Sequence, residues 1–110
     1  MKKVGIIRCR QTEDMCPGSG CLKAVSGGKL AFEEYGPCEI IGMVTCGGCP
    51  GKRAIPRAKM LAERGAEIIA FASCIFNGTP IGFPCPHADT MKRAVREKVG
   101  ADIVLLDYTH

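Results

Sequence analysis

The chain has 110 residues, of which 46% are hydrophobic and 24% charged, with a formal net charge of +4. A chain of this length has room for one hydrophobic core, so we expect a single domain over residues 1–110. The mean hydropathy of +0.09 excludes intrinsic disorder, which requires low hydrophobicity and a high net charge. No apolar run approaches the roughly 20 residues of a membrane span, so we expect no membrane partner.

The amino-terminal residues and the aromatic content narrow the expected location and partners. Met1-Lys2-Lys3 is followed by only four apolar residues, Val4–Ile7, which is too short for the apolar region of a secretory signal peptide. We therefore expect a cytoplasmic protein. The chain is mildly basic, with two Tyr, four Phe and no Trp, so it has few stacking platforms and we do not expect nucleic acid as a partner. The sequence points to no particular protein partner.

Strands and helices alternate along the sequence. Short apolar segments predict four strands, at Lys3–Cys9, Glu39–Thr45, Glu67–Ser73 and Asp102–Asp107. The second is apolar without alternation, as in a strand covered on both faces. Apolar residues at helical spacing predict helices at Arg53–Arg64 and Ala88–Val99, a shorter one at Cys21–Ser26 and an extra turn at Leu30–Tyr35. This alternation predicts a three-layer α/β/α fold with a four-stranded parallel sheet in the flavodoxin-like order 2-1-3-4.

Cysteine is the most unusual component of the chain, with eight residues. In an open parallel sheet, ligands bind outside the carboxyl ends of the strands. Each predicted strand runs into a cysteine or histidine there, and the loops that follow add more. The candidate metal ligands at this edge are Cys9, Cys16, Cys21, Cys46, Cys49, Cys74, Cys85, His87 and His110. We expect them to converge on one rim of the sheet.

Other uses of cysteine explain this distribution less well. Free cysteines often pack as small hydrophobes, which explains Cys38 at the start of a strand on the opposite edge. The predicted strand interiors, however, contain Val, Ile and Ala. Structural disulfides are rare in a cytoplasmic α/β chain. Metal or redox chemistry remains, and the basic excess would partly balance the negative charge of thiolates, although a solvated basic surface also explains it.

The motif Cys46-Gly47-Gly48-Cys49 is the sharpest in the sequence. Two intervening residues let both sulfurs reach one tetrahedral ion, and the glycines let the backbone turn tightly. Proline follows Cys16, Cys49 and Cys85. Because proline suits the first position of a helix, Cys49 and Cys85 are expected near helix N-termini. Thioredoxin-like proteins also place a strand, CxxC and a helix in this order, so a thiol–disulfide redox enzyme using Cys46 and Cys49 is the alternative function.

The combination of motifs resembles the CGGC domain, a small family of predicted metal-binding proteins, across nearly the whole chain. The resemblance is carried by Arg8-Cys9, Cys16-Pro17-Gly18 with Cys21, Cys46–Gly51, Cys74, Pro84-Cys85-Pro86 and Thr109-His110. It implies a metal-binding role, usually given as zinc, and no established reaction. From the ligand types themselves, we expect zinc first, because tetrahedral sulfur and imidazole sites suit it. An iron–sulfur cluster comes second, because four cysteines suffice and Cys-Pro recurs in ferredoxin motifs.

Overall fold

The computed structural model describes all 110 residues and contains one four-stranded sheet. The strands are β1 (Lys3–Arg8), β2 (Glu39–Thr45), β3 (Ile68–Phe71) and β4 (Val104–Leu106). They lie in the order β2-β1-β3-β4, and all three pairings are parallel. The predicted fold class and strand order are therefore confirmed.

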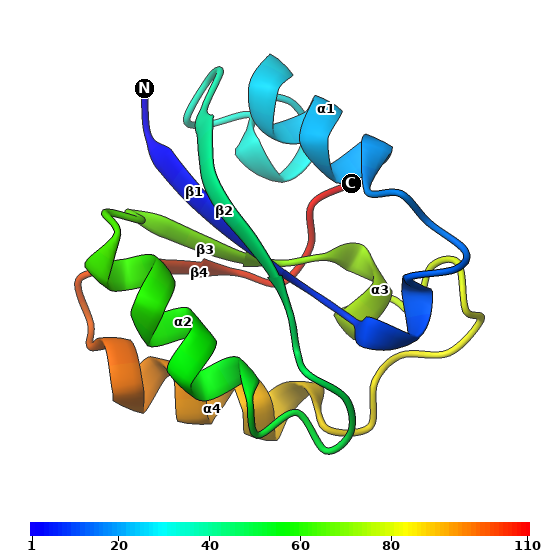
Figure 1. Ribbon diagram of the computed structural model, residues 1–110. Coiled ribbons are helices and arrows are strands. Elements are labelled where there is room, and N and C mark those ends of the chain that lie inside the picture. The colour runs from blue at the N-terminus through cyan, green and yellow to red at the C-terminus, as the bar shows by residue number, and fades with distance from the viewer.

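Helices cover both faces of the sheet (Figure 1). On one face lies α1 (Ser19–Gly27), and on the other lie α2 (Ala54–Glu63) and α4 (Ala88–Val99), which pack against each other. The connection from β1 to β2 moves across the sheet in one direction, and the later connections move in the other. Because parallel crossovers are right-handed, this reversal places α1 opposite the other two helices.

Short helical turns follow the central strands and depart from the predicted boundaries. The 3-10 turn η1 (Arg10–Thr12) directly follows Cys9, and the one-turn helix α3 (Ser73–Phe76) replaces the end of the predicted third strand. The predicted extra turn is found as η2 (Leu30–Phe32). Strands β1 and β3 are thus shorter than predicted at their carboxyl ends, since the chain turns into η1 and α3 there, whereas β2 has the predicted bounds.

Burial in the sheet follows the position of each strand. The central strand β3 is buried along its whole length, whereas β2 is half-buried after its exposed first residue. As expected for a strand covered on both faces, β2 contacts α1 on one face and α2 on the other, and it is only half-buried because it has a neighbouring strand on one side only. Gly5 in β1 lets α2 pack closely, since an added Cβ there would lie 2.8 Å from Leu61 Cδ1. No helix combines the length and apolar character needed to cross a membrane.

Candidate metal centre

The Cys46–Cys49 turn leaves β2 at the carboxyl edge and is tied to α2. Gly47 and Gly48 have φ angles of +80° and +101°, a backbone region that glycine adopts without steric cost. The Thr45 hydroxyl accepts the Gly47 N–H at 3.1 Å. Arg57 of α2 donates Nη1–H to both the Thr45 hydroxyl and the Thr45 carbonyl, at 2.9 and 3.0 Å. This arginine holds the base of the turn and places positive charge behind it.

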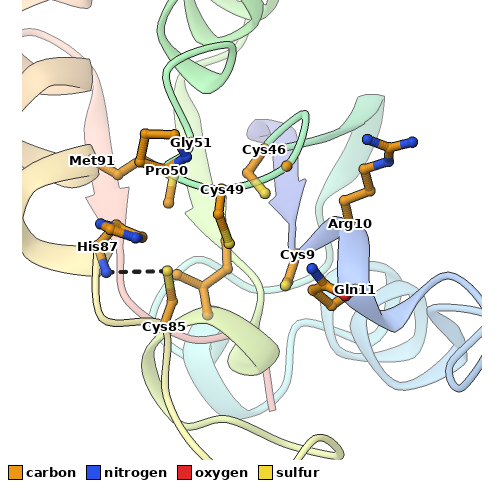
Figure 2. Close-up of a pocket in the computed structure, with 12 residues that line it drawn as sticks. Cys9, Arg10, Gln11, Cys46, Cys49, Pro50, Gly51, Cys85, His87 and Met91 are labelled. Atoms are coloured by element: carbon orange, nitrogen blue, oxygen red, sulfur yellow. Dashed lines mark hydrogen bonds between the residues drawn. The ribbon is translucent and has the colours of Figure 1, made fainter.

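The turn forms one wall of a narrow cavity that we call the signature recess (Figure 2). It encloses about 10 Å³, about the space of one water-sized group. Its potential ligands are Cys9, Cys46, Cys49, Cys85 and His87. The first two are buried, Cys85 and His87 are half-buried, and Cys49 is exposed. Four sulfurs from three separate segments of the chain therefore surround one small space.

Burial favours the neutral form of two thiols in the signature recess, those of Cys9 and Cys85. It raises the pKa of Cys9, and a hydrogen bond from the Gln11 backbone opposes this effect. Burial also raises the pKa of Cys85, although the His87 N–H donates a hydrogen bond to Cys85 Sγ at 3.3 Å. The surrounding sulfurs raise both pKa values further, because neighbouring thiolates would repel one another. A bound cation reverses this preference, since a coordinated thiol is deprotonated.

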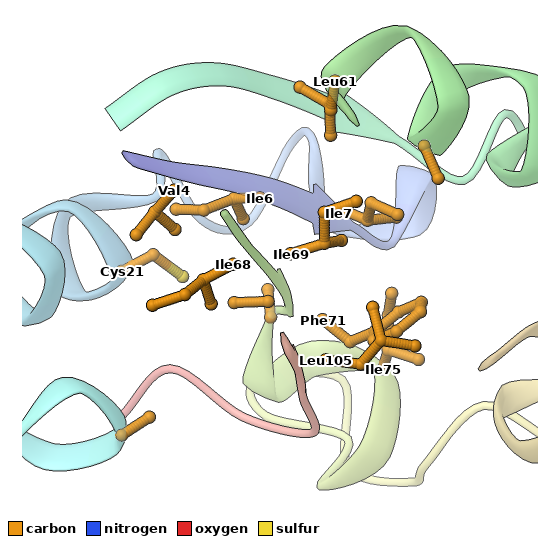
Figure 3. Packing of buried hydrophobic residues seen from close by; sticks show 14 of the residues in the cluster. Val4, Ile6, Ile7, Cys21, Leu61, Ile68, Ile69, Phe71, Ile75 and Leu105 are labelled. Carbon is orange, nitrogen blue, oxygen red and sulfur yellow. The ribbon is translucent and has the colours of Figure 1, made fainter. Parts of the chain in front are cut away.

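A second narrow cavity, which we call the tail recess, lies beside α1 and also encloses about 10 Å³. Its potential ligands are Cys16, Cys21, Cys74 and His110. Cys21 belongs to α1 and is 5% exposed, and Figure 3 shows it beside Val4 and Ile68 on that face of the sheet. His110 is exposed.

Hydrogen bonds fix the carboxyl-terminal segment beside α1. Ser73 Oγ accepts the N–H groups of Thr109 and His110, at 3.2 and 3.1 Å, and donates to the His110 carbonyl at 2.7 Å. The Thr109 hydroxyl lies 3.1 Å from Cys21 Sγ. A Cβ added at Gly20 would lie 3.0 Å from His110 Nε2, so the imidazole lies directly against the start of α1.

Arg8 ties the segment that carries Cys16 to the end of β1. Its Nη2 donates to the carbonyl and hydroxyl oxygens of Thr12, at 3.2 and 3.1 Å, and also to the Cys16 carbonyl. Burial raises the pKa of Cys21; the hydrogen bond with the Thr109 side chain opposes this effect most, and the Arg8 charge opposes it to a smaller extent. The tail recess therefore contains a fixed cation that favours thiolate.

All nine predicted ligands line one of the two recesses. We expected one converging group; the two recesses divide the nine residues, but a wider cavity of about 150 Å³ joins Cys9, Cys49, Cys74 and Cys85, so Cys74 borders both groups. In neither recess do three His, Cys, Asp or Glu side chains converge closely enough to hold one ion as they stand, and all eight cysteines are free. The donors surround small cavities, so metal coordination would require side chains to turn inward.

The structure tests the expected positions of Cys49 and Cys85 near helix N-termini and of Cys38 at the opposite edge of the sheet. Cys49 does not begin a helix, because α2 starts only at Ala54, whereas Cys85 precedes α4 by three residues. Cys38 lies at the opposite edge of the sheet, as predicted, where it is 4% exposed and donates to the Gly36 carbonyl at 3.1 Å. Burial alone does not distinguish the candidate ligands from Cys38, since Cys9, Cys21, Cys46 and Cys74 are also buried. The separation rests on position at the carboxyl edge.

The polar residues that fix the ligands were not predicted from the sequence. Thr12, Ser73 and Thr109 are each at most 1% exposed and make hydrogen bonds beside the cysteines. The available signal was a hydroxyl side chain directly after an apolar strand, as in Phe71-Ala72-Ser73. Arg57 left no such signal, because its spacing on α2 is that of a solvent-facing residue.

Comparison with known proteins supports the reading of these motifs. Residues 3–110 match the CGGC domain. This chain belongs to the CGGC domain family. The uncharacterized protein MJ0582 of Methanocaldococcus jannaschii is 36% identical over 115 residues, covering 97% of this CGGC domain chain and 87% of its own length. The uncharacterized protein MJ0766 of the same organism is 39% identical over 64 residues, covering 57% of this chain and 91% of itself.

No solved structure shows a significant match to this CGGC domain. Its family membership and its eight cysteines point to a metal-binding role. The names of the two relatives assign no metal and no reaction.

Proposed function

We propose that this protein binds a zinc ion in the signature recess through Cys9, Cys46, Cys49 and Cys85. The observation that carries the proposal is that four sulfurs from three segments line one cavity of about 10 Å³. Tetrahedral zinc sites built from four cysteines are a common structural type. His87 lines the same recess and is the alternative donor for one position.

The surroundings of the recess suit a negatively charged sulfur cluster. The Cys9 and Cys85 thiols are polarised by neighbouring backbone N–H groups, and hydrogen bonds to sulfur tune metal-bound thiolates. Arg10 lies against the turn, since a Cβ added at Gly48 would lie 3.4 Å from Arg10 Nη1. This cation offsets part of the charge that four thiolates would bring together.

The same donors would suit an iron–sulfur cluster, which is the second choice of metal group. Four cysteine thiolates are the usual ligand set of such clusters. Zinc is preferred because the His87 imidazole lines the recess beside the sulfurs, and sites built from sulfur and imidazole donors suit zinc. Visible absorption distinguishes the two, since zinc is colourless and an iron–sulfur cluster is not.

Elemental analysis of the protein purified without oxygen, from cells given no extra metal, tests the proposal. We expect zinc to copurify, and we expect Cys46→Ala and Cys49→Ala to lower its content relative to the wild type. Cys38→Ala is the matched control, because it removes a buried thiol from the opposite edge of the sheet. Metal-free wild-type protein with its thiols still reduced would rule the proposal out.

A thiol–disulfide exchange function is the second candidate, favoured by the unequal exposure of Cys46 and Cys49. Cys49 is exposed and Cys46 is buried, an arrangement that suits one attacking and one resolving thiol. The Cys49 thiolate would attack a partner disulfide, releasing one partner thiolate and forming a mixed disulfide. Attack by Cys46 on the Cys49 sulfur would then release the second partner thiolate and leave a Cys46–Cys49 disulfide.

Counting free thiols separates the two candidates. If metal masks the cysteines, a chelator alone restores their reaction with a thiol reagent. If Cys46 and Cys49 form a disulfide, the count rises only after a reductant is added. The Cys38 thiol again serves as the internal reference, because it lies at the opposite edge of the sheet and takes part in neither candidate function.

A further inference from the structure

We propose that the tail recess binds a second metal ion, held by Cys16, Cys21, Cys74 and His110. This inference builds on the proposed zinc binding in the signature recess and divides the rim into two sites. Three sulfurs and one imidazole nitrogen form a standard tetrahedral zinc set. The eight donors assigned to the two recesses make one set of four sulfurs and one set of three sulfurs with an imidazole, and Cys74, which also lines a wider cavity with Cys9, Cys49 and Cys85, is assigned to the second set.

Each of the three sulfurs of the tail recess has a hydrogen-bond partner, although all three must turn inward to reach one ion. Cys16 Sγ accepts the Gly18 N–H at 3.4 Å, and Cys74 Sγ accepts the Cys9 N–H at 3.3 Å. Cys21 Sγ lies 3.1 Å from the Thr109 hydroxyl. Partners of this kind are typical of the outer shell of metal sites, where they orient ligands and stabilise thiolate.

His110 is positioned to complete the set. Ser73 fixes its backbone through two hydrogen bonds, at 3.1 and 2.7 Å. The absence of a side chain at Gly20 lets the imidazole lie against α1, next to Cys21. In Figure 1 the red carboxyl-terminal segment runs from β4 to the side of α1, which brings this residue across from the far edge of the sheet.

An open groove beside the tail recess offers an ion a route from solvent. His110 lines both the tail recess and an open groove along α1, which Lys23 and Lys29 border. An ion arriving from solvent would therefore meet the imidazole first. The three cysteines lie further inside, because Cys21 and Cys74 are 5% and 8% exposed.

Arg8 gives this second site its charge balance. Its guanidinium lines the recess and is fixed by the carbonyl oxygens of Thr12 and Cys16. Three thiolates and one divalent ion carry a net charge of −1, and one neighbouring cation neutralises it.

Metal stoichiometry tests the inference. The reduced protein is loaded with excess zinc, desalted and analysed for zinc per chain, with circular dichroism confirming that each variant is folded. We expect two ions in the wild type and in Cys38→Ala. We expect one ion in His110→Ala, whose side chain is exposed, and one in Cys46→Ala. The combination of both substitutions should retain none.

The possible outcomes separate this inference from the proposed function. Two ions in His110→Ala and in Cys21→Ala would overturn the second site and leave the signature site intact. One ion in the wild type, lost in both His110→Ala and Cys46→Ala, would show one shared site and overturn the division. No ion in the wild type would overturn both proposals. Replacing zinc by Co²⁺ adds a spectroscopic readout, because His110→Ala should remove only the absorption of the sulfur–nitrogen site.

Discussion

The backbone N–H of Cys9 donates a hydrogen bond to Cys74 Sγ at 3.3 Å, across the carboxyl ends of β1 and β3. The parallel register makes this contact, because Ile7 pairs with Phe71 and the Ala72 N–H donates to the Ile7 carbonyl at 2.8 Å. The backbone of Cys9 thus orients a sulfur of the tail recess, while its own side chain lines the signature recess. This contact is where the two recesses meet.

The effects of Cys9→Ala and Cys74→Ala should therefore combine differently with His110→Ala. Each single substitution should remove about one zinc ion per chain. Adding His110→Ala to Cys74→Ala should cause no further loss, because both residues serve the tail recess. Adding it to Cys9→Ala should leave no zinc. Such non-additivity is expected only for residues that share a site, and elemental analysis measures it. Identical zinc contents in the two double variants would contradict the assignment.

Chelation should leave the sheet folded. The 26 buried hydrophobic residues form one cluster, and only four of them, Cys9, Cys21, Cys46 and Cys74, are candidate ligands, so most of this core does not depend on an ion. Far-ultraviolet circular dichroism should change little when zinc is removed, whereas protease sensitivity should rise in residues 10–20 and 74–86. Complete loss of secondary structure, as in zinc fingers, would show instead that the whole chain needs the metal in order to fold.

Two glycines in the loop between α3 and α4 offer a matched test of how that loop packs. Gly78 and Gly82 both have positive φ, +78° and +110°, so alanine is strained at either position. A Cβ at Gly78 would also lie 2.2 Å from the Phe83 carbonyl carbon, whereas at Gly82 it would meet nothing within 4 Å. Gly82→Ala should cost about 1–2 kcal/mol of stability, and Gly78→Ala more.

The metal content of these two variants is the second readout. The loop carries Cys85, whose N–H donates to the Ile75 carbonyl at 2.7 Å. Displacing Phe83 in Gly78→Ala should move Cys85 and lower zinc retention, while Gly82→Ala should retain zinc. Denaturant unfolding and elemental analysis measure the two effects. Equal zinc contents would show that the loop conformation does not position Cys85.

Alkylation of the reduced, metal-free protein should begin at Cys49. Cys49 is exposed, whereas Cys38 is 4% exposed and burial raises the pKa of its thiol. Both properties slow the reaction of Cys38, because the reactive species is an accessible thiolate. Mass spectrometry after a short iodoacetamide pulse should locate the first modification at Cys49 and leave Cys38 unmodified until the protein unfolds. Early modification of Cys38 would contradict its placement.

The Cys38 thiol should also reduce stability at alkaline pH. Its pKa in the folded chain is raised above the ordinary 9.0, so above about pH 9 the unfolded chain releases this proton first. The free energy of unfolding should therefore fall as pH rises through that range, by at most about 1.4 kcal/mol per pH unit for one proton. Cys38→Ala should make the decline shallower. Val25→Ala, which truncates another buried side chain, should lower stability and keep the slope. Denaturant unfolding between pH 8 and 11 measures both.

The sequence by itself determined the architecture and the edge that carries the candidate ligands. Apolar segments separated by helical periodicity predicted four parallel strands with helices on both faces, and the order 2-1-3-4 is that of flavodoxin-like folds with the same alternation. The parallel arrangement placed Cys9, Cys46 and Cys74 at the carboxyl ends and Cys38 at the other edge. These inferences depend only on which residue follows which strand, so local pattern was sufficient.

Only the tertiary structure decided how the rim is divided. The tail recess joins Cys21, Cys74 and His110, which lie far apart in the chain, and their neighbourhood depends on how the carboxyl-terminal segment crosses to α1. Hydrogen bonds from Ser73 fix that crossing, and no spacing rule encodes them. The exposure of Cys49 beside buried Cys46 likewise depends on the turn being tied to Arg57 in another element. Sequence spacing gives the order of ligands along the chain, whereas long-range packing determines which of them share one cavity.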